Sequence, residues 1–149
     1  MALYFKDITT LEQARIKAEE AQPVWGMIQI DNIEELTKGL SDRDYTNLWA
    51  DINNIVVAEI DGFDGFIRNF QDDMYTFAIS RGALVKMESD GFKILEKIRK
   101  LPSPRQIPAT ISIGISENVG TAKEVSERAR AALDIALGRG GDQVCIMDG

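Results

Sequence analysis

The fold is decided by the stretch Gly65-Phe66-Ile67-Arg68-Asn69-Phe70-Gln71-Asp72-Asp73-Met74-Tyr75-Thr76-Phe77-Ala78-Ile79. It contains two strand-like runs, at residues 65–70 and 74–79, separated by a short polar segment. Polar residues at such a join are typical of a tight β-turn, so the stretch predicts a β-hairpin.

Before the hairpin, the pattern predicts a helix, a buried strand and two further helices. Capping boxes at Thr9 and Thr10 open the first helix, which runs to about Ala21. The strand covers residues 24–30, a short helix capped by Asp31 or Asn32 ends near residue 39, and the next helix covers about 42–59.

After the hairpin, helix and strand patterns alternate. They predict a helix at 83–101 that stops before Pro102, a strand at 109–115, a helix opened by Thr121, and a last strand at 143–147. This order predicts the α+β class, with a central, mostly antiparallel five-stranded sheet flanked by helices and preceded by a connecting helix.

Composition excludes several classes of protein. The 149 residues are 44% hydrophobic, which is enough for one globular core. A net charge of -7 with scattered Lys and Arg argues against nucleic-acid binding. We find no targeting or membrane-spanning pattern, so we expect a soluble segment that does not insert into a membrane. With no histidine, carboxylates are the remaining acid-base or metal groups.

Three local matches indicate a known fold. Ile28-Gln29-Ile30-Asp31 stands where a strand would end in Asp-x-Asp, Ser112-Ile113-Gly114-Ile115 follows a Ser-Ile-Gly pattern, and residues 132–144 keep the spacing of a last helix and strand. In this order they resemble the GGDEF family of cyclic-dinucleotide synthases. The resemblance implies a GGDEF, or adenylyl-cyclase-like palm, fold over about residues 24–147.

The family's functional residues are replaced in this chain. By the resemblance, Gln29 and Met74 stand at metal-ligand positions, although neither is a charged oxygen ligand. The positions of base-reading residues hold Thr37 and Thr46, and those of phosphate-facing residues hold Leu137 and Gly141. We therefore expect no diguanylate cyclase activity.

The sequence around these replacements also resembles a narrower family. Residues 28–32, 42–44 and 133–143 resemble the modified GGDEF domain of GdpP/YybT-type cyclic-di-AMP phosphodiesterases. That family implies two membrane helices, a PAS domain, this degenerate domain and a DHH/DHHA1 phosphodiesterase, whose metal ligands include histidine. We interpret residues 1–22 as the end of a PAS-like segment, with a final strand at 3–9 and a connecting helix. We interpret residues 23–149 as the degenerate domain, which the resemblance implies is excised from a parent anchored on the cytoplasmic side of the bacterial plasma membrane.

The resemblance also implies nucleotide contact, since weak ATP hydrolysis has been associated with the modified domain. Candidate contacts are Asp31, Asp72, Asp73, Arg139 and Asp142, and Asp31 and Asp73 could hold Mg²⁺ with ATP. Each has a structural alternative, which we rank first for each residue singly. Asp31 suits a helix cap, Asp72 and Asp73 suit a turn, and the glycine-rich loop 138–142 follows a helix rather than opening one.

Three functions remain open from the sequence. The first is a regulatory module that binds nucleotide and couples the upstream PAS and downstream DHH/DHHA1 domains, with its entry helix as a rod or homodimer contact. The second is a weak Mg²⁺-dependent ATPase that uses Asp31, Asp73 and Arg139. The third is a purely structural spacer.

Overall fold

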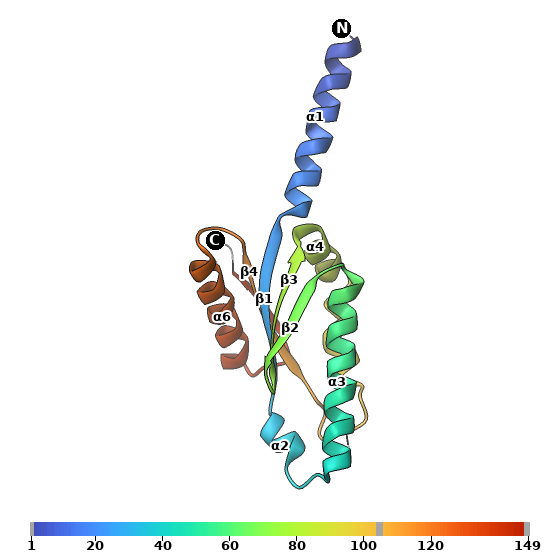
Figure 1. The fold of residues 1–149 in the computed structure, drawn as a ribbon, viewed down its shortest axis with the longest axis vertical. Coiled ribbons are helices and arrows are strands. Elements are labelled where there is room, and N and C mark those ends of the chain that lie inside the picture. Colours follow the sequence, from blue (N-terminus) through green and yellow to red (C-terminus); the bar gives the residue numbers. More distant parts are fainter. Residues whose placement is uncertain (1, 104–105, 148–149) are drawn as a thin grey trace.

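The predicted hairpin lies at one edge of a five-stranded sheet in a computed structural model that describes residues 2–103 and 106–147, with side chains from residue 9 (Figure 1). Within these ranges the elements are α1 (Ala2–Ala21), β1 (Pro23–Ile30), α2 (Ile33–Thr37), α3 (Asp42–Gly62), β2 (Phe66–Gln71), β3 (Met74–Ser80), α4 (Arg81–Ser89), α5 (Lys93–Arg99), β4 (Ile111–Glu117), α6 (Ala122–Gly138) and β5 (Val144–Met147).

The sheet has the strand order β2-β3-β1-β4-β5. The pairs β2–β3, β3–β1 and β1–β4 are antiparallel, whereas β4 and β5 are parallel. The predicted α+β class and mostly antiparallel five-stranded sheet are therefore confirmed.

Helices cover both faces of the sheet. On one face, α3, α4 and α5 pack apolar side chains against the buried residues Ile28, Phe77 and Ile113. Helix α6 covers the other face (Figure 1) and approaches β4 so closely that a Cβ at Gly114 would lie 2.2 Å from Leu133 N. Each large buried side chain of this kind contributes about 1.5–3 kcal/mol, so the two helical layers fix the sheet from both sides.

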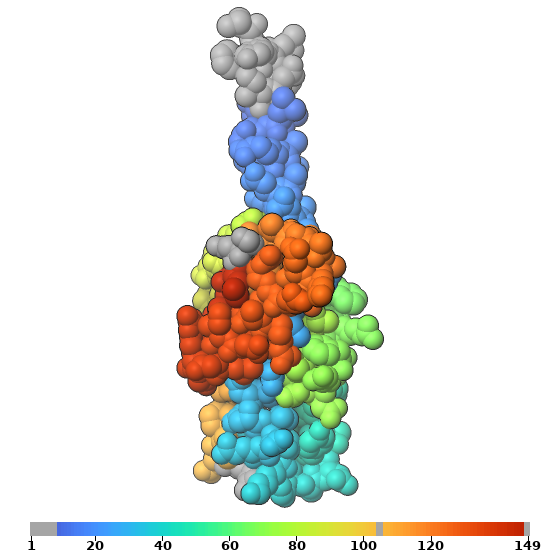
Figure 2. All heavy atoms as spheres, turned by 90° about the vertical axis from the view of Figure 1, so that its left-hand side faces the viewer, coloured from blue at the N-terminus to red at the C-terminus, as the bar shows by residue number. Residues whose placement is uncertain are grey.

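Helix α1 projects from this body (Figures 1 and 2). Its side chains from Thr9 to Ala21 are all exposed, and its end meets α4, where Glu20 lies beside Gly82. The predicted strand at 3–9 and the predicted start at Thr9 or Thr10 are wrong, because the helix begins at Ala2. A helix satisfies its own backbone hydrogen bonds, whereas a strand needs a neighbouring strand.

The single helix predicted at 83–101 is two helices. Gly91 and Phe92 adopt left-handed backbone angles, with φ of 73° and 54°. Phe92 N donates to Met87 O at 2.9 Å, a bond that closes the end of α4 in a Schellman motif. The chain then restarts as α5, with Lys93 N donating to the carboxylate of Asp90.

The periodic apolar neighbours of Trp25, Phe66 and Phe77 in the sequence predict core packing for all three rings, and the structure buries only the last of them. Phe77 lies in the core, but Trp25 is 38% exposed and Phe66 is 61% exposed. Both lie on strands, in the row of partners Phe66, Ala78 and Trp25 across β2, β3 and β1. Among the described residues, no helix has the length and apolar content required to cross a bilayer.

Candidate functional site

The hairpin tip is held to helix α3 and strand β1 through its backbone. Asp72 O accepts a hydrogen bond from Trp49 Nε1 at 3.2 Å, and Asp73 O accepts one from Ile30 N at 2.8 Å. Asn69 Nδ2 donates to the carbonyls of Gln71 and Met74, where the β2–β3 register is irregular. The predicted turn at Asp72 and Asp73 is confirmed.

The two replaced metal-ligand positions meet in the structure. Gln29 on β1 is the direct antiparallel partner of Met74 on β3. Met74 is only 4% exposed, and Arg130 Nη1 lies 3.8 Å from its sulfur. Gln29 Nε2 donates to Asp73 Oδ2 at 3.3 Å. The fold therefore brings these positions together, but they carry an amide and a thioether.

Asp31 joins three segments that are distant in the sequence. Its carboxylate accepts hydrogen bonds from Thr110 Oγ1 at 2.8 Å, Ser112 Oγ at 2.8 Å and the backbone N of Asp142 at 2.9 Å. The cap of α2 is instead Asn32, which makes no side-chain capping bond. The predicted capping role of Asp31 is therefore wrong, and its carboxylate fastens the loop after α6 to β1 and β4.

That loop is also tied to α5. Arg99 Nε lies 2.8 Å from Asp142 Oδ2. The sequence did not predict a role for Arg99, because Arg99 and Asp142 are 43 positions apart and no local pattern connects them. The same holds for Thr110, whereas Ser112 belongs to the Ser-Ile-Gly strand that indicated the fold.

The other predicted contacts are more dispersed. Arg139 forms the exposed C-cap of α6, and Asp72 is exposed at the turn. Within residues 9–103 and 106–147, neither side chain makes a hydrogen bond or ion pair with the other candidate residues. Thr46 is exposed on α3, while Thr37 Oγ1 donates to Ile33 O at the end of α2.

An open depression of about 340 Å³ connects several of these positions. Its lining includes Gln29, Asp31, Leu137 and Gly141. Gly141 has a φ of 76°, and a Cβ there would lie 2.8 Å from Asp31 Oδ2. The backbone thus approaches Asp31 at a position where a side chain has little room, so the phosphate-facing residue implied by the GGDEF resemblance has no equivalent here.

The residues at this site fit a magnesium ion poorly. Magnesium requires oxygen ligands that converge on one point. Both oxygens of Asp31 already accept bonds from protein donors, and Asp73 accepts one from Gln29. In the part of the chain that the structure describes, no three His, Cys, Asp or Glu side chains are grouped for metal binding. Magnesium binding by Asp31 and Asp73 stays a prediction.

Comparison with known proteins identifies the family. The family model described as "Cyclic-di-AMP phosphodiesterase GdpP-like, GGDEF domain" matches residues 28–149. The chain is 31% identical to cyclic-di-AMP phosphodiesterase GdpP of Geobacillus thermodenitrificans, over 99% of this chain and 22% of that protein. It is also 31% identical to cyclic-di-AMP phosphodiesterase PdeA of Listeria monocytogenes, over 97% and 22% of the two chains.

Solved structures show the same fold at lower sequence identity. The active GGEEF domain of a diguanylate cyclase from Vibrio cholerae superposes with a TM-score of 0.72 at 14% identity, covering 89% of this chain and 87% of that chain. The chain thus has the GGDEF fold and spans about a fifth of the length of its curated relatives. It belongs to the family of GdpP-like GGDEF domains of cyclic-di-AMP phosphodiesterases.

Proposed function

We propose that this domain is a regulatory module of a longer, membrane-anchored cyclic-di-AMP phosphodiesterase, on the cytoplasmic side of the membrane. It couples an upstream PAS sensor to a downstream DHH/DHHA1 catalytic domain and is not itself a diguanylate cyclase. The observation that carries this proposal is the Gln29–Met74 pair. Metal-assisted phosphoryl transfer needs charged oxygen ligands at the metal, and this pair supplies none.

Helix α1 is suited to the coupling role. It projects from the domain and exposes Leu11 at 70% and Ile16 at 43%, so apolar side chains on it are available to a second copy of the chain. Its last turns meet α4, which follows β3 directly. A rotation of α1 would therefore act on the strand that carries Met74, and pairing of two α1 helices would form a homodimer.

Nucleotide binding is a second part of the proposal. The depression beside Asp31 supports it, because the depression is open and contains the positions of the GGDEF phosphate contacts. Because the residues of the depression fit magnesium poorly, we expect nucleotide binding there rather than nucleotide hydrolysis. Calorimetry of the domain with ATP, GTP and cyclic dinucleotides, with and without Mg²⁺, tests this part, and the absence of heat with every ligand would leave only mechanical coupling.

The coupling role is tested in the full-length protein that contains this chain. We expect the double substitution Leu11→Lys and Ile16→Lys to change the rate of cyclic-di-AMP hydrolysis several-fold, because it alters the exposed apolar side chains of α1. Lys17→Ala, on the same helix, is the matched control. Sedimentation of the same proteins reports pairing. Equal hydrolysis rates and equal sedimentation in all three proteins would overturn the coupling role.

A further inference from the structure

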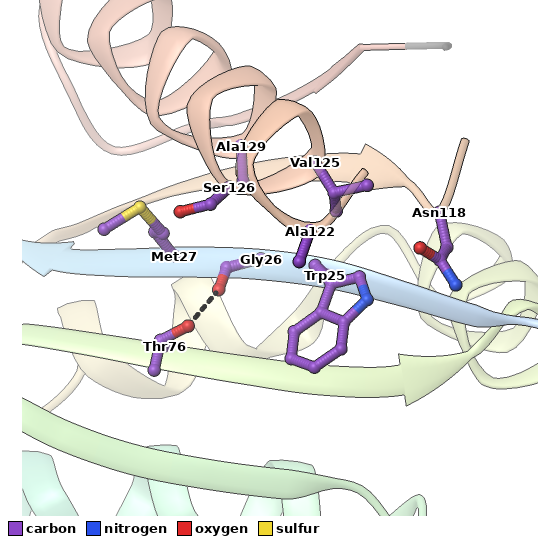
Figure 3. A pocket seen from close by; sticks show the side chains of 9 residues that line it. All are labelled: Trp25, Gly26, Met27, Thr76, Asn118, Ala122, Val125, Ser126 and Ala129. Carbon is purple, nitrogen blue, oxygen red and sulfur yellow. Dashed lines mark hydrogen bonds between the residues drawn. The ribbon is translucent and has the colours of Figure 1, made fainter. Parts of the chain in front are cut away.

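A second cavity lies on the α6 face of the sheet, away from the depression at Asp31. Its volume is about 280 Å³, and it opens between the first half of α6 and strands β1 and β3 (Figure 3). Trp25 on β1 lines it, six residues before Asp31. No described residue lines both hollows: this cavity is lined by the first half of α6, whereas the depression is lined by Leu137 and the glycines after it, so the two hollows are separate.

The cavity exists because α6 presents small side chains to a sheet that it cannot approach further. Ala122, Ser126 and Ala129 follow one another at about one-turn intervals and line the cavity. Farther along the helix, the backbone of Leu133 already rests on Gly114 of β4, and this contact fixes the height of α6 above the sheet. The space beside β1 is therefore left unfilled.

The walls combine an aromatic ring with a few polar groups. Figure 3 shows Trp25 and Asn118 toward one end of the cavity, and Met27 and Ser126 toward the other. Within residues 9–103 and 106–147, the Trp25 indole N–H, the Asn118 amide and the Ser126 hydroxyl have no hydrogen-bond partner in the protein, and Asn118 and Ser126 are exposed to solvent. None of the residues that line the cavity is charged.

This chemistry selects a flat heterocycle. An indole face stacks on a nucleobase with about 1–3 kcal/mol per base. An asparagine amide offers one donor and one acceptor side by side, which matches the N6 and N7 edge of adenine. Small-molecule sites usually occupy about 300–1,000 Å³, so a cavity of about 280 Å³, just below this range, admits one ring system and leaves a sugar outside.

We propose that this cavity binds the adenine ring of an adenosine-type ligand. The ring lies against Trp25 with its polar edge toward Asn118, and the ribose with any phosphates extends into solvent. Because the lining supplies no cation to hold phosphate, recognition depends on the base. The site is independent of the proposed coupling role and of the depression at Asp31.

Trp25 provides a direct probe. The chain has two tryptophans, so the substitution Trp49→Phe leaves Trp25 as the sole indole reporter. In this background we expect adenosine to quench the fluorescence saturably, with a dissociation constant below about 1 mM, the weak end of specific binding. AMP and ATP should bind within about threefold of adenosine, with or without Mg²⁺, since their phosphates remain in solvent. Guanosine should bind at least about fivefold more weakly, because its edge presents two acceptors.

Variants locate the site. Ala122→Leu, and Ser126→Ile as a second filling variant, should weaken adenosine binding at least about tenfold by occupying the cavity. Asn118→Ala should weaken it by about fivefold or more. The matched control Asn54→Ala removes an exposed amide on α3, outside this cavity, and should leave binding unchanged. Circular dichroism checks that each variant is folded.

Three results would overturn the proposal. The first is an absence of adenosine binding at 5 mM, verified by equilibrium dialysis of the unmodified chain. The second is unchanged affinity in both filling variants. The third is binding of ATP only with Mg²⁺ and not of adenosine, which would place the site at phosphate-binding groups elsewhere. If Ala122→Leu altered sedimentation while adenosine failed to bind, the cavity would instead accept a second copy of the chain.

Discussion

Gln29 on β1 and Met74 on β3 lie directly opposite each other in the antiparallel register. The scaffold thus still brings together two positions that carry metal ligands in the GGDEF resemblance. What has changed is the charge and softness of the side chains. This relationship predicts that substitution of the two side chains can introduce a metal site.

The double substitution Gln29→Asp and Met74→Glu should create a divalent-ion site at the cost of stability. Without metal, two opposed carboxylates repel each other, and the one at the buried Met74 position loses hydration, so we expect the free energy of unfolding to fall by about 2 kcal/mol or more. An ion that binds the folded state restores about 2.7 kcal/mol at 100 times its dissociation constant. Thermal unfolding with and without Mn²⁺ measures both effects.

The matched control for this experiment is Gln29→Asn with Met74→Leu, which keeps the pair uncharged. Its unfolding temperature should not respond to Mn²⁺. If the carboxylate pair also fails to respond, the strands do not place the two side chains close enough to share an ion.

Local patterns predicted the sheet well and the site incompletely. The hairpin, the Ser-Ile-Gly strand and the Thr121 cap of α6 depend on residues within a few positions of one another, so their signals are visible in the sequence. The partners of Asp31 lie 79, 81 and 111 residues away. A carboxylate beside a helix start suggests a cap, and only the register of β1 with β4 shows that it bonds elsewhere.

The predicted boundaries of the helices were wrong for similar reasons. Periodicity continues across Gly91, but the left-handed angles there end α4 and redirect the chain into α5. The start of α1 was missed because Leu3-Tyr4-Phe5 has the composition of a strand, while the choice between helix and strand depends on whether a partner strand is present. Exposed Trp25 and Phe66 were predicted to be buried because apolar neighbours do not reveal which part of a sheet α6 leaves open.

Asp31→Ala should be among the most destabilising single substitutions outside the core. The substitution leaves two hydroxyls and one backbone N–H without their acceptor. Each hydrogen bond to a charged acceptor contributes about 1.5–3 kcal/mol. Because water can replace Asp31 as the acceptor for some of these donors, we expect the free energy of unfolding, measured with urea, to fall by about 2–4 kcal/mol. Asp51→Ala, which removes an exposed carboxylate on α3, should change stability by less than about 0.5 kcal/mol. Equal effects of the two would contradict the joining role of Asp31.

Gly141→Ala and Gly138→Ala form a matched pair at the end of α6. At Gly141 the backbone is left-handed and a Cβ would lie 2.8 Å from Asp31 Oδ2, so we expect a loss of about 1–3 kcal/mol. At Gly138 a Cβ meets nothing within 4 Å, and alanine favours the helix, so stability should stay level or rise by up to about 1 kcal/mol. Denaturant unfolding measures both. A similar loss at the two positions would show that the approach to Asp31 does not restrict Gly141.

Tyr75 should make the domain sensitive to alkaline pH. Burial raises the pKa of its phenol to about 12, and its hydroxyl donates to Asn53 Oδ1 at 2.9 Å. An unfolded tyrosine ionises near pH 10, so between pH 10 and 12 the unfolded state releases a proton that the folded state keeps, and the free energy of unfolding falls by about 1.4 kcal/mol per pH unit. Below pH 10 this contribution is constant.

Tyr75→Phe should lower the free energy of unfolding by about 1 kcal/mol at pH 7. It should also remove the fall in stability between pH 10 and 12 that the Tyr75 phenol causes, whereas Tyr45→Phe, at an exposed ring, should leave that fall in place. Urea unfolding from pH 8 to 12 measures both slopes, and equal slopes in the two variants would mean that Tyr75 ionises as freely in the folded domain as in the unfolded chain.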